Sequence, residues 1–155
     1  MSIAVKRVEN AAEFQTLHEL LVEYERDLPA DLRHGAEPSL EDVRRRYHAD
    51  NAGFLAILDA DYGGCVAVTL LDARTAVLQR LYVRAPHRGR GAARALTMAA
   101  IGYARERGCE RIVLDTEAER LRAAYELYRS VGFRECEAYG AVDYRCPTFM
   151  ELQLR

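Results

Sequence analysis

Apolar and polar residues alternate from Ile3 to Val8, a pattern typical of a strand with one buried face. Asn10 follows as a suitable N-cap, and the apolar residues after it recur at helical spacing. These positions are Phe14, Leu17, Leu20, Leu21, Tyr24 and Leu28. Pro29 comes next, so we expect one long amphipathic helix between Asn10 and Pro29.

A second, shorter helix signal follows the segment 30–38, which has the composition of a loop. Ser39 and Asp42 resemble a capping box, in which the first and fourth residues cap each other's backbone amides. Val43 and Tyr47 then lie four residues apart, on one face of a helix. We therefore expect a short helix through these two residues.

Three apolar, partly β-branched runs form the middle of the chain. They are Phe54–Leu58, Cys65–Leu71 and Val77–Val83, separated by Tyr62–Gly64 and Asp72–Arg74. Connections this short join antiparallel strands, because a parallel crossover needs a dozen or more residues. The pattern predicts consecutive hairpins.

The second half of the chain alternates helices with strands. A helix is expected from Gly91 to Arg107, capped by Gly108, and another from Leu121 to Val131. The expected strands are Arg111–Asp115, Phe133–Cys136 and Phe149–Leu154. The whole order, β-α-α-β-β-β-α-β-α-β-β, predicts a mixed α+β fold with a mostly antiparallel, twisted sheet flanked by helices. We expect a single domain over residues 1–155, because this length is ordinary for one domain.

Charge and hydropathy narrow the classes of function. The net charge is −2, whereas nucleic-acid-binding domains are usually basic. No apolar run approaches the ~20 residues of a membrane span, and the N-terminal segment lacks the basic-then-apolar order of a signal peptide. We therefore expect a cytoplasmic protein that neither binds nucleic acid nor enters a membrane.

The cysteines suggest structural thiols rather than a metal site. No CxxC pair occurs among them, so no zinc site and no other bound metal are expected. Most lie in or beside apolar stretches, where a free cysteine behaves as a small buried hydrophobe. The four are Cys65, Cys109, Cys136 and Cys146.

The segment Arg88–Ala93, with the sequence RGRGAA, joins an expected strand to the beginning of an expected helix. The first amides of a helix have no intrahelical acceptor, and the helix dipole adds partial positive charge there. Gly89 and Gly91 would let the backbone approach an anion closely. The cations at this point are Arg88, Arg90 and Arg94. Because cations at a helix N-terminus oppose the dipole, they favour a bound anion such as a pyrophosphate.

Other phosphate-binding motifs do not fit this loop. A P-loop requires GxxxxGK followed by Ser or Thr, and the sequence contains none. A dinucleotide fold requires GxGxxG early in a βαβ unit, but Arg94 stands at the third glycine position and hairpins precede the loop. From the loop alone, a solvent-exposed turn rich in arginine stays open as the alternative.

Two motifs together resemble those of the GNAT superfamily of N-acetyltransferases. The loop pattern [QR]-x-x-G-x-[GA] is filled by Arg88, Gly91 and Ala93, after a strand ending in Leu81–Val83. The pattern A-x-x-L-Y-x-x-x-G-F is similar to Ala124–Phe133, which reads AYELYRSVGF. The resemblance extends over about residues 3–154, and the order of elements agrees. It implies the acyl-CoA N-acyltransferase fold, with acetyl-CoA as co-substrate.

The resemblance also implies roles for particular residues. Backbone groups of Leu81, Tyr82 and Val83 would pair with the pantetheine arm, as an added strand does. The loop amides would hold the pyrophosphate; these residues are Arg88, Gly89, Arg90, Gly91, Ala92 and Ala93. The strand ending at Val83 should diverge from the strand that follows the long helix, leaving a slot for the cofactor.

In the family, the tyrosine of the L-Y segment protonates the leaving thiolate, and this position is Tyr128. A phenol has a pKa of about 10, close to that of an alkyl thiol, so the proton transfer would be nearly balanced. The alternative is that Tyr128 only packs on its helix face, and Tyr125 is easily confused with it. The oxyanion would accept a hydrogen bond from a backbone amide near Tyr82.

The general base is not evident from the sequence. Many family members carry a glutamate in the strand before the loop, where this chain has Val77. The frequent asparagine seven residues before the tyrosine is Leu121 here. A water chain, Glu23 or Glu25 could take the proton, although we interpret both glutamates first as solvated helix charges.

The implied reaction is direct attack by an amine, of a small molecule or a protein, on acetyl-CoA in a ternary complex. The acceptor would enter over the first helices, whose Arg44–Arg46 run we interpret as a solvated face. A small acidic or amino-acid-like amine would suit this region, with protein N-termini and lysines as alternatives. A homodimer is possible in such families.

Two other classes of function stay open at this stage. One is a non-catalytic acyl-CoA-binding sensor or scaffold, suggested by the missing glutamate and asparagine. The other is a nucleic-acid binder that uses the arginine cluster, which the net charge of −2 argues against. Thiol release with a panel of amines would separate an enzyme from both.

Overall fold

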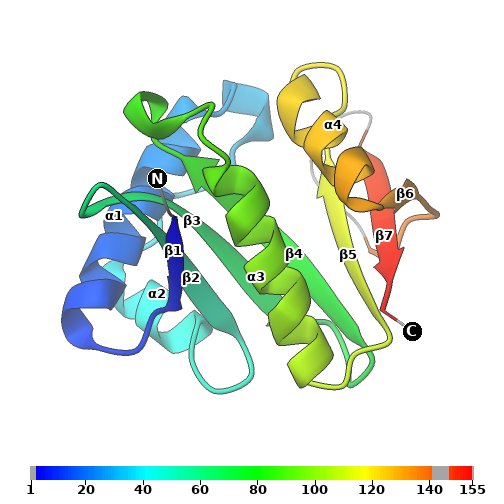
Figure 1. Ribbon diagram of the computed structural model, residues 1–155, viewed down its shortest axis with the longest axis horizontal. Helices are drawn as coiled ribbons and strands as arrows, with labels where there is room; N and C mark the ends of the chain where they lie inside the picture. The colour runs from blue at the N-terminus through cyan, green and yellow to red at the C-terminus, as the bar shows by residue number, and fades with distance from the viewer. Residues whose placement is uncertain (1–2, 141–146, 155) are drawn as a thin grey trace.

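The computed structural model describes residues 3–140 and 147–154. Within these residues, seven strands form one sheet in the order β1-β2-β3-β4-β5-β7-β6 (Figure 1). Neighbouring strands are antiparallel except for β4 and β5, which are parallel. This confirms the predicted mixed, mostly antiparallel sheet. The strands are β1 (Ala4–Arg7), β2 (Ala52–Leu58), β3 (Asp61–Leu70), β4 (Thr75–Val83), β5 (Arg111–Thr116), β6 (Arg134–Glu135) and β7 (Thr148–Gln153).

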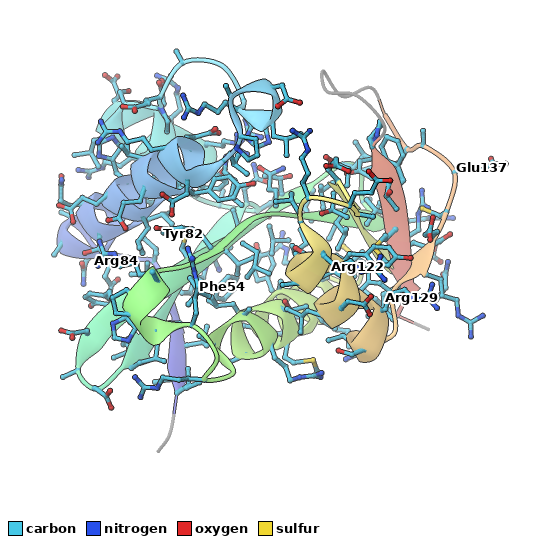
Figure 2. The ribbon with its side chains drawn as sticks, turned by 90° about the horizontal axis from the view of Figure 1, so that it is seen from above. Phe54, Tyr82, Arg84, Arg122, Arg129 and Glu137 are labelled. Atoms are coloured by element: carbon cyan, nitrogen blue, oxygen red, sulfur yellow. The ribbon has the colours of Figure 1, made fainter. Side chains whose placement is uncertain are left out.

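Helices cover both faces of this sheet. Helices α1 and α2 pack on one face, and α3 and α4 pack on the other (Figures 1 and 2). Their bounds are α1 (Ala11–Asp27), α2 (Leu40–Arg46), α3 (Ala92–Glu106) and α4 (Arg122–Val131), with short 3₁₀ turns η1 (Ala30–Leu32) and η2 (Ala85–His87). No helix in the described ranges is both long enough and apolar enough to cross a membrane.

The predicted helix starts are confirmed by their caps. Asn10 accepts a hydrogen bond from the Glu13 amide at 2.9 Å, while the Glu13 carboxylate accepts one from the Asn10 amide at 3.1 Å. Ser39 and Asp42 form the same reciprocal capping box at the start of α2. Both helices therefore begin where the local sequence satisfies the first amides.

Strand residues alternate between the two cores. Phe54 and Leu58 of β2 pack toward α3, whereas Leu55 packs toward α1 and α2. All three are buried, because helices cover both faces of the central strands. The alternation fixes which side chains of β4 and β5 reach each face, and this decides the layout of the site.

The first hairpin turn differs from the prediction. Tyr62–Gly64 was expected to separate β2 from β3, but β3 begins at Asp61 and the turn is made by Asp59 and Ala60. Both turn residues have positive φ, 53° and 69°, as a tight two-residue turn requires. Gly64 is a strand residue for a packing reason, because a Cβ there would lie 2.6 Å from the Tyr82 carbonyl oxygen.

Smaller differences concern ends and thiols. The expected strand Phe133–Cys136 is reduced to β6, and the helix expected from Leu121 begins one residue later, with Leu121 as its N-cap. Cys65 and Cys109 are buried free thiols, and Cys136 is a partly buried one. Cys146 lies outside the described residues.

Candidate active site

The parallel pair β4 and β5 opens into a slot. Their register pairs only Thr75–Val77 with Arg111–Val113, and beyond these residues the two strands diverge (Figure 1). The splay expected from the sequence is therefore present. It exposes the backbone of the second half of β4 beside α4.

A β-bulge in β4 lies next to this opening. Cys65 of β3 opposes Tyr82 and Ala67 opposes Gln79, so Arg80 and Leu81 together oppose a single residue. Arg80 has a φ of 55°, in the left-handed region that non-glycine residues rarely occupy. The extra residue shifts the pleat, so that Leu81 packs toward the α3 face and Tyr82 toward the α1 face.

The slot continues into a pocket of about 650 Å³ between β4, α3, α4 and the end of α1. Eight of the nine residues expected to bind the cofactor line it. These are Leu81, Tyr82, Val83, Arg88, Gly89, Gly91, Ala92 and Ala93. Arg90 is the exception, because its guanidinium turns away and pairs with Asp59 at 2.8 Å. A role for Arg90 can therefore involve its backbone but not its charge at the pocket.

The loop at the pocket has the geometry expected of an anion site. Gly91 is the N-cap of α3 with a φ of 89°, and no side chain of the described residues caps the helix. Gly89 has a φ of 78°, and a Cβ there would meet nothing within 4 Å. The first amides of α3 therefore face open space with the helix dipole behind them.

Arginines from three elements surround this end of the pocket. Arg88 donates to the Val83 carbonyl at 2.8 Å and lies 3.5 Å from Asp27, while Arg94 donates to Ser130 of α4 at 2.7 Å. Arg94 forms no ion pair with any described residue. Arg122 of α4 also lines the pocket, across from Tyr82 (Figure 2).

A charged bridge joins the two sides of the pocket mouth. Arg120, before α4, donates to both carboxylate oxygens of Asp31 in η1, at 2.9 and 2.8 Å. Its Nε donates to Glu117 at 2.6 Å. The bridge holds the loop after α1 against the loop after β5, and Tyr24 and Leu28 line the pocket on the α1 side.

Tyr128 lies on α4 behind the residues that line the pocket. Its ring is buried and meets Phe133 edge to face, with ring centroids 5.8 Å apart. Burial raises the pKa of Tyr128, and the nearby Tyr24 and Asp115 raise it further. The hydroxyl therefore stays protonated at neutral pH and can donate a hydrogen bond. Tyr125 faces outward instead and donates to Glu135 at 2.6 Å.

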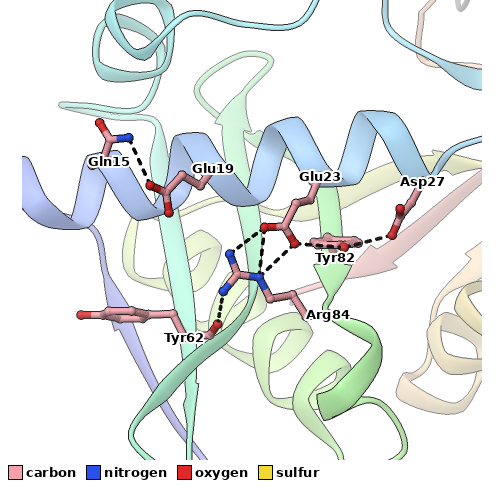
Figure 3. Close-up of polar contacts among 7 residues, drawn as sticks. All are labelled: Gln15, Glu19, Glu23, Asp27, Tyr62, Tyr82 and Arg84. Atoms are coloured by element: carbon pink, nitrogen blue, oxygen red, sulfur yellow. Dashed lines mark hydrogen bonds and ion pairs between the residues drawn. The ribbon is translucent and has the colours of Figure 1, made fainter.

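A polar network ties Tyr82 to α1 (Figure 3). The Tyr82 hydroxyl donates to Asp27 at 3.0 Å and lies 3.3 Å from a Glu23 oxygen, and Arg84 donates to both oxygens of Glu23. Arg84 also donates to the Tyr62 carbonyl at 3.0 Å. The hydrogen bonds from Arg84 hold the pKa of Glu23 below its usual range, whereas burial and Asp27 raise the pKa of Tyr82.

The interpretation of the two glutamates as solvated helix charges is wrong for the buried Glu25, whereas Glu23 is partly exposed and ion-paired. Glu23 is bound by Arg84, and its lowered pKa makes it a poor proton acceptor. Glu25 is 4% exposed and accepts from the His34 amide at 3.1 Å, with the His34 ring nitrogen 2.6 Å away. Both carboxylates bind other elements to α1.

The sequence did not reveal the part that α1 and the loop before α4 play in the pocket. Their lining residues include Tyr24, Asp27, Arg120 and Leu121. No local sequence motif identifies these residues, because they reach the slot only when α1 packs across the sheet. The Arg120–Asp31 bridge joins residues 89 positions apart and has no signature in either segment.

A family model for the acetyltransferase (GNAT) family matches residues 14–133. No curated protein sequence gives a significant match. Among solved structures, yncA from Salmonella typhimurium, a putative acetyltransferase determined with its cofactor acetyl-CoA, has a TM-score of 0.82 at 20% identity. That match covers 100% of this chain and 95% of the other.

Two further structures have similar folds. A GNAT-family acetyltransferase from Staphylococcus aureus Mu50 has a TM-score of 0.77 at 20% identity, over 99% of this chain and 100% of the other. The ribosomal-protein-S18-alanine N-acetyltransferase from Escherichia coli has a TM-score of 0.72 at 19% identity, over 99% and 94%. At these identities, the likeness to solved structures shows a shared fold.

Proposed function

The chain belongs to the acetyltransferase (GNAT) family, and on this premise we propose that it transfers the acetyl group of acetyl-CoA to an amine. The observation that supports this best is the slot between β4 and β5, which leads directly to the cap-free N-terminus of α3. A long ligand with an anionic group at one end fits such a site.

The proposed position of the cofactor follows from this geometry. The pyrophosphate would accept hydrogen bonds from the loop amides of Arg88–Ala93, with Arg94 adding charge. The pantetheine arm would pair with the backbone of Leu81–Val83, where β4 has left β5. The thioester would then lie beside the bulge, within reach of a backbone amide near Tyr82.

Tyr128 is the proposed proton donor. As the amine nitrogen attacks the thioester carbon, the carbonyl oxygen becomes an oxyanion, and the C–S bond then breaks to release a thiolate. The Tyr128 hydroxyl would donate a hydrogen bond to this sulfur and pass on its proton. Its raised pKa keeps the hydroxyl protonated but makes proton transfer to a thiolate less favourable than the balanced case expected from the sequence, so the hydrogen bond to the sulfur would come first. Solvent would reprotonate the hydroxyl after turnover.

Asp115 is the proposed proton acceptor for the amine. On β5, Ile112 and Leu114 pack toward α3, so the alternate residue Asp115 projects to the α1 face. Its carboxylate accepts a hydrogen bond from Tyr139 at 2.8 Å, and its charge contributes to the raised pKa of Tyr128. It therefore stands at the end of β5 on the side where an acceptor would enter.

A thiol-release assay with acetyl-CoA and a broad amine panel tests the proposal, with mass spectrometry to identify the acetylated product. Release that depends on an amine and yields an amide supports acetyl transfer. Tight acetyl-CoA binding without release from any amine would favour the alternative of a sensor or scaffold module. A single domain over residues 1–155, a cytoplasmic location, the absence of bound metal and a homodimer remain predictions from the sequence.

A further inference from the structure

We propose that the acceptor amine also carries a carboxylate, which Arg46 and Arg80 bind in a second pocket on the α1–α2 side of the sheet. The inference rests on the proposed function for the reaction, but the anion site stands on its own residues. The substrate class that this site would select is amines of the amino-acid type.

The second pocket has a volume of about 410 Å³ and adjoins the slot at the bulge. Arg80 lines this pocket, whereas the next residue, Leu81, lines the slot. On α1, Leu21 lines the second pocket and Tyr24, one turn later, lines the slot. A ligand in the second pocket can therefore extend toward the point proposed for the thioester.

The acidic residues of this pocket are already neutralised. Glu37 accepts two hydrogen bonds from Arg26, at 2.7 and 3.2 Å. Asp42 pairs with Arg45 at 2.5 Å and also accepts the amide hydrogen bond of the α2 cap. The hydrogen bonds from Arg26 hold the pKa of Glu37 below its usual range, and those with Ser39, together with Arg45, lower the pKa of Asp42, so both groups remain ionised.

The remaining two cations have no such partner. Among the described residues, neither Arg46 nor Arg80 forms an ion pair. Both guanidinium groups instead converge on one neutral oxygen, Oε1 of Gln79, at 3.2 and 2.9 Å. The Tyr47 hydroxyl donates to the same oxygen at 3.3 Å. The Arg44–Arg46 run is exposed, as the sequence interpretation expected, and Arg46 in addition donates a hydrogen bond to Gln79.

This arrangement suits a carboxylate better than an amide oxygen. A carbonyl oxygen offers two lone pairs, and three donors compete for them here, two at distances above 3.1 Å. A carboxylate offers two oxygens and a full negative charge, and it matches the forked geometry of guanidinium groups. It would also neutralise two like charges held close together.

The backbone supports the same conclusion. Arg80 keeps a φ of 55° although it is not glycine, and such conformations persist where the surroundings hold them and cluster at functional sites. Its carbonyl oxygen is contacted by the buried Cys65 thiol at 3.7 Å. The bulge directs the Arg80 side chain away from the α3 core and toward Arg46 and Gln79.

The test compares amino acids, ω-amino acids and dipeptides with their matched C-terminal amides, assayed by thiol release. We expect kcat/KM to be at least tenfold higher for the acids. Arg80→Gln and Arg46→Gln should each lower kcat/KM for the acids by about 30-fold or more, as expected for loss of a charged contact, and change the amides by less than about threefold. Arg46 is exposed at the end of α2, so its variant remains informative if Arg80→Gln impairs folding.

Arg44→Gln is the matched control, because it removes the same charge from the same helix while Arg44 stacks over Phe14 outside this pocket. Calorimetry measures binding of the same acids and amides in the presence of coenzyme A. It tests the carboxylate site separately from the proposed acetyl transfer. Acid binding that requires Arg46 and Arg80 without any acetyl transfer would support the site and refute the proposed function. Acetyl transfer with equal preference for acids and amides, unchanged in both variants, would overturn the carboxylate site and leave the proposed function intact.

Discussion

The two pockets on either side of the β4 bulge are built in different ways. In the cofactor slot, one continuous segment, Leu81–Ala93, supplies the strand edge and the helix amides, and residues of α1 and α4 complete the lining. The second pocket is made of side chains from α1, the loop after it, α2 and β4. A backbone site leaves a motif in the sequence, because glycines and strand-to-helix order are local, whereas a side-chain site assembled from distant elements leaves none.

The largest expected effect concerns the backbone of the slot. Gly91→Val would place a β-branched residue at a φ of 89° and displace the first amides of α3. Losing one or two hydrogen bonds to a charged group, at about 1.5–3 kcal/mol each, should weaken acetyl-CoA binding by about 100-fold. Isothermal titration calorimetry measures this directly.

Gly35→Val is the matched control for Gly91→Val. Gly35 also has a positive φ, 92°, and a Cβ there meets nothing within 4 Å, but it lies in the loop before α2. We expect a comparable loss of stability with acetyl-CoA affinity within about threefold of the parent. Equal loss of affinity in both variants would show that the Gly91 effect reflects general destabilisation.

The next effect concerns the chemistry at the end of the slot. Tyr128→Phe should lower kcat by about 100-fold, the lower range of general acid catalysis, with acetyl-CoA affinity unchanged. Tyr125→Phe, three residues earlier on α4 and bonded outward to Glu135, should leave kcat unchanged. A loss of less than about threefold for Tyr128→Phe would assign Tyr128 to packing against Phe133 alone.

A smaller effect is expected on the acceptor side. Asp115→Asn should lower kcat by about tenfold, because water can partly replace a carboxylate as proton acceptor. Steady-state thiol release with the best amine measures it, and Asp72→Asn, in the turn before β4, serves as the control. Unchanged turnover in Asp115→Asn would contradict its assignment as the base.

The same contrast between local patterns and distant contacts decides which parts of the fold the sequence predicts. The caps at Asn10 and Ser39 and the alternation in the central strands are local, and they are confirmed with small shifts at the ends. The turn at Asp59 and Ala60 was missed because neither residue is glycine, while the nearby glycines have a packing role.

In the candidate site too, the sequence predicted the residues of a local motif but not the contacts between distant elements. The sequence predicted the loop residues Arg88–Ala93 as pocket residues. Arg90 differs, because its guanidinium pairs with Asp59. The sequence did not predict the partners of Glu23 and Glu25. Arg84 and His34 contact these carboxylates only because of the way α1 packs in the folded chain. Burial and pairing of this kind depend on tertiary contacts that no local pattern encodes.

The smallest expected effect is a pH-dependent term in stability. Arg84 lowers the pKa of Glu23 in the folded state, so this contact stabilises the protein above the unfolded pKa of about 4.5 and is lost as pH falls through the folded value. Glu23→Gln should reduce the free energy of unfolding at pH 7 by less than about 1 kcal/mol, because the pair is partly exposed. The difference from the parent should shrink below pH 4.5. Urea unfolding at several pH values measures it.

Glu19→Gln provides the comparison for that measurement. Glu19 lies one turn earlier on α1 and accepts from Gln15 at 3.3 Å, and its effect on Arg84 is weaker than that of Glu23 (Figure 3). It should show no such pH-dependent difference. If Glu23→Gln and Glu19→Gln behave alike across the pH range, the Glu23–Arg84 pair does not stabilise the join between α1 and β4.

A crystal structure of the protein with coenzyme A tests the central claim most directly. We expect the pyrophosphate on the amides of Arg88–Ala93 and the pantetheine arm against the backbone of Leu81–Val83, with the thiol near the bulge and Tyr128. Coenzyme A bound elsewhere, or a pyrophosphate without contact to these amides, would contradict the assignment of the slot and the mechanism that depends on it.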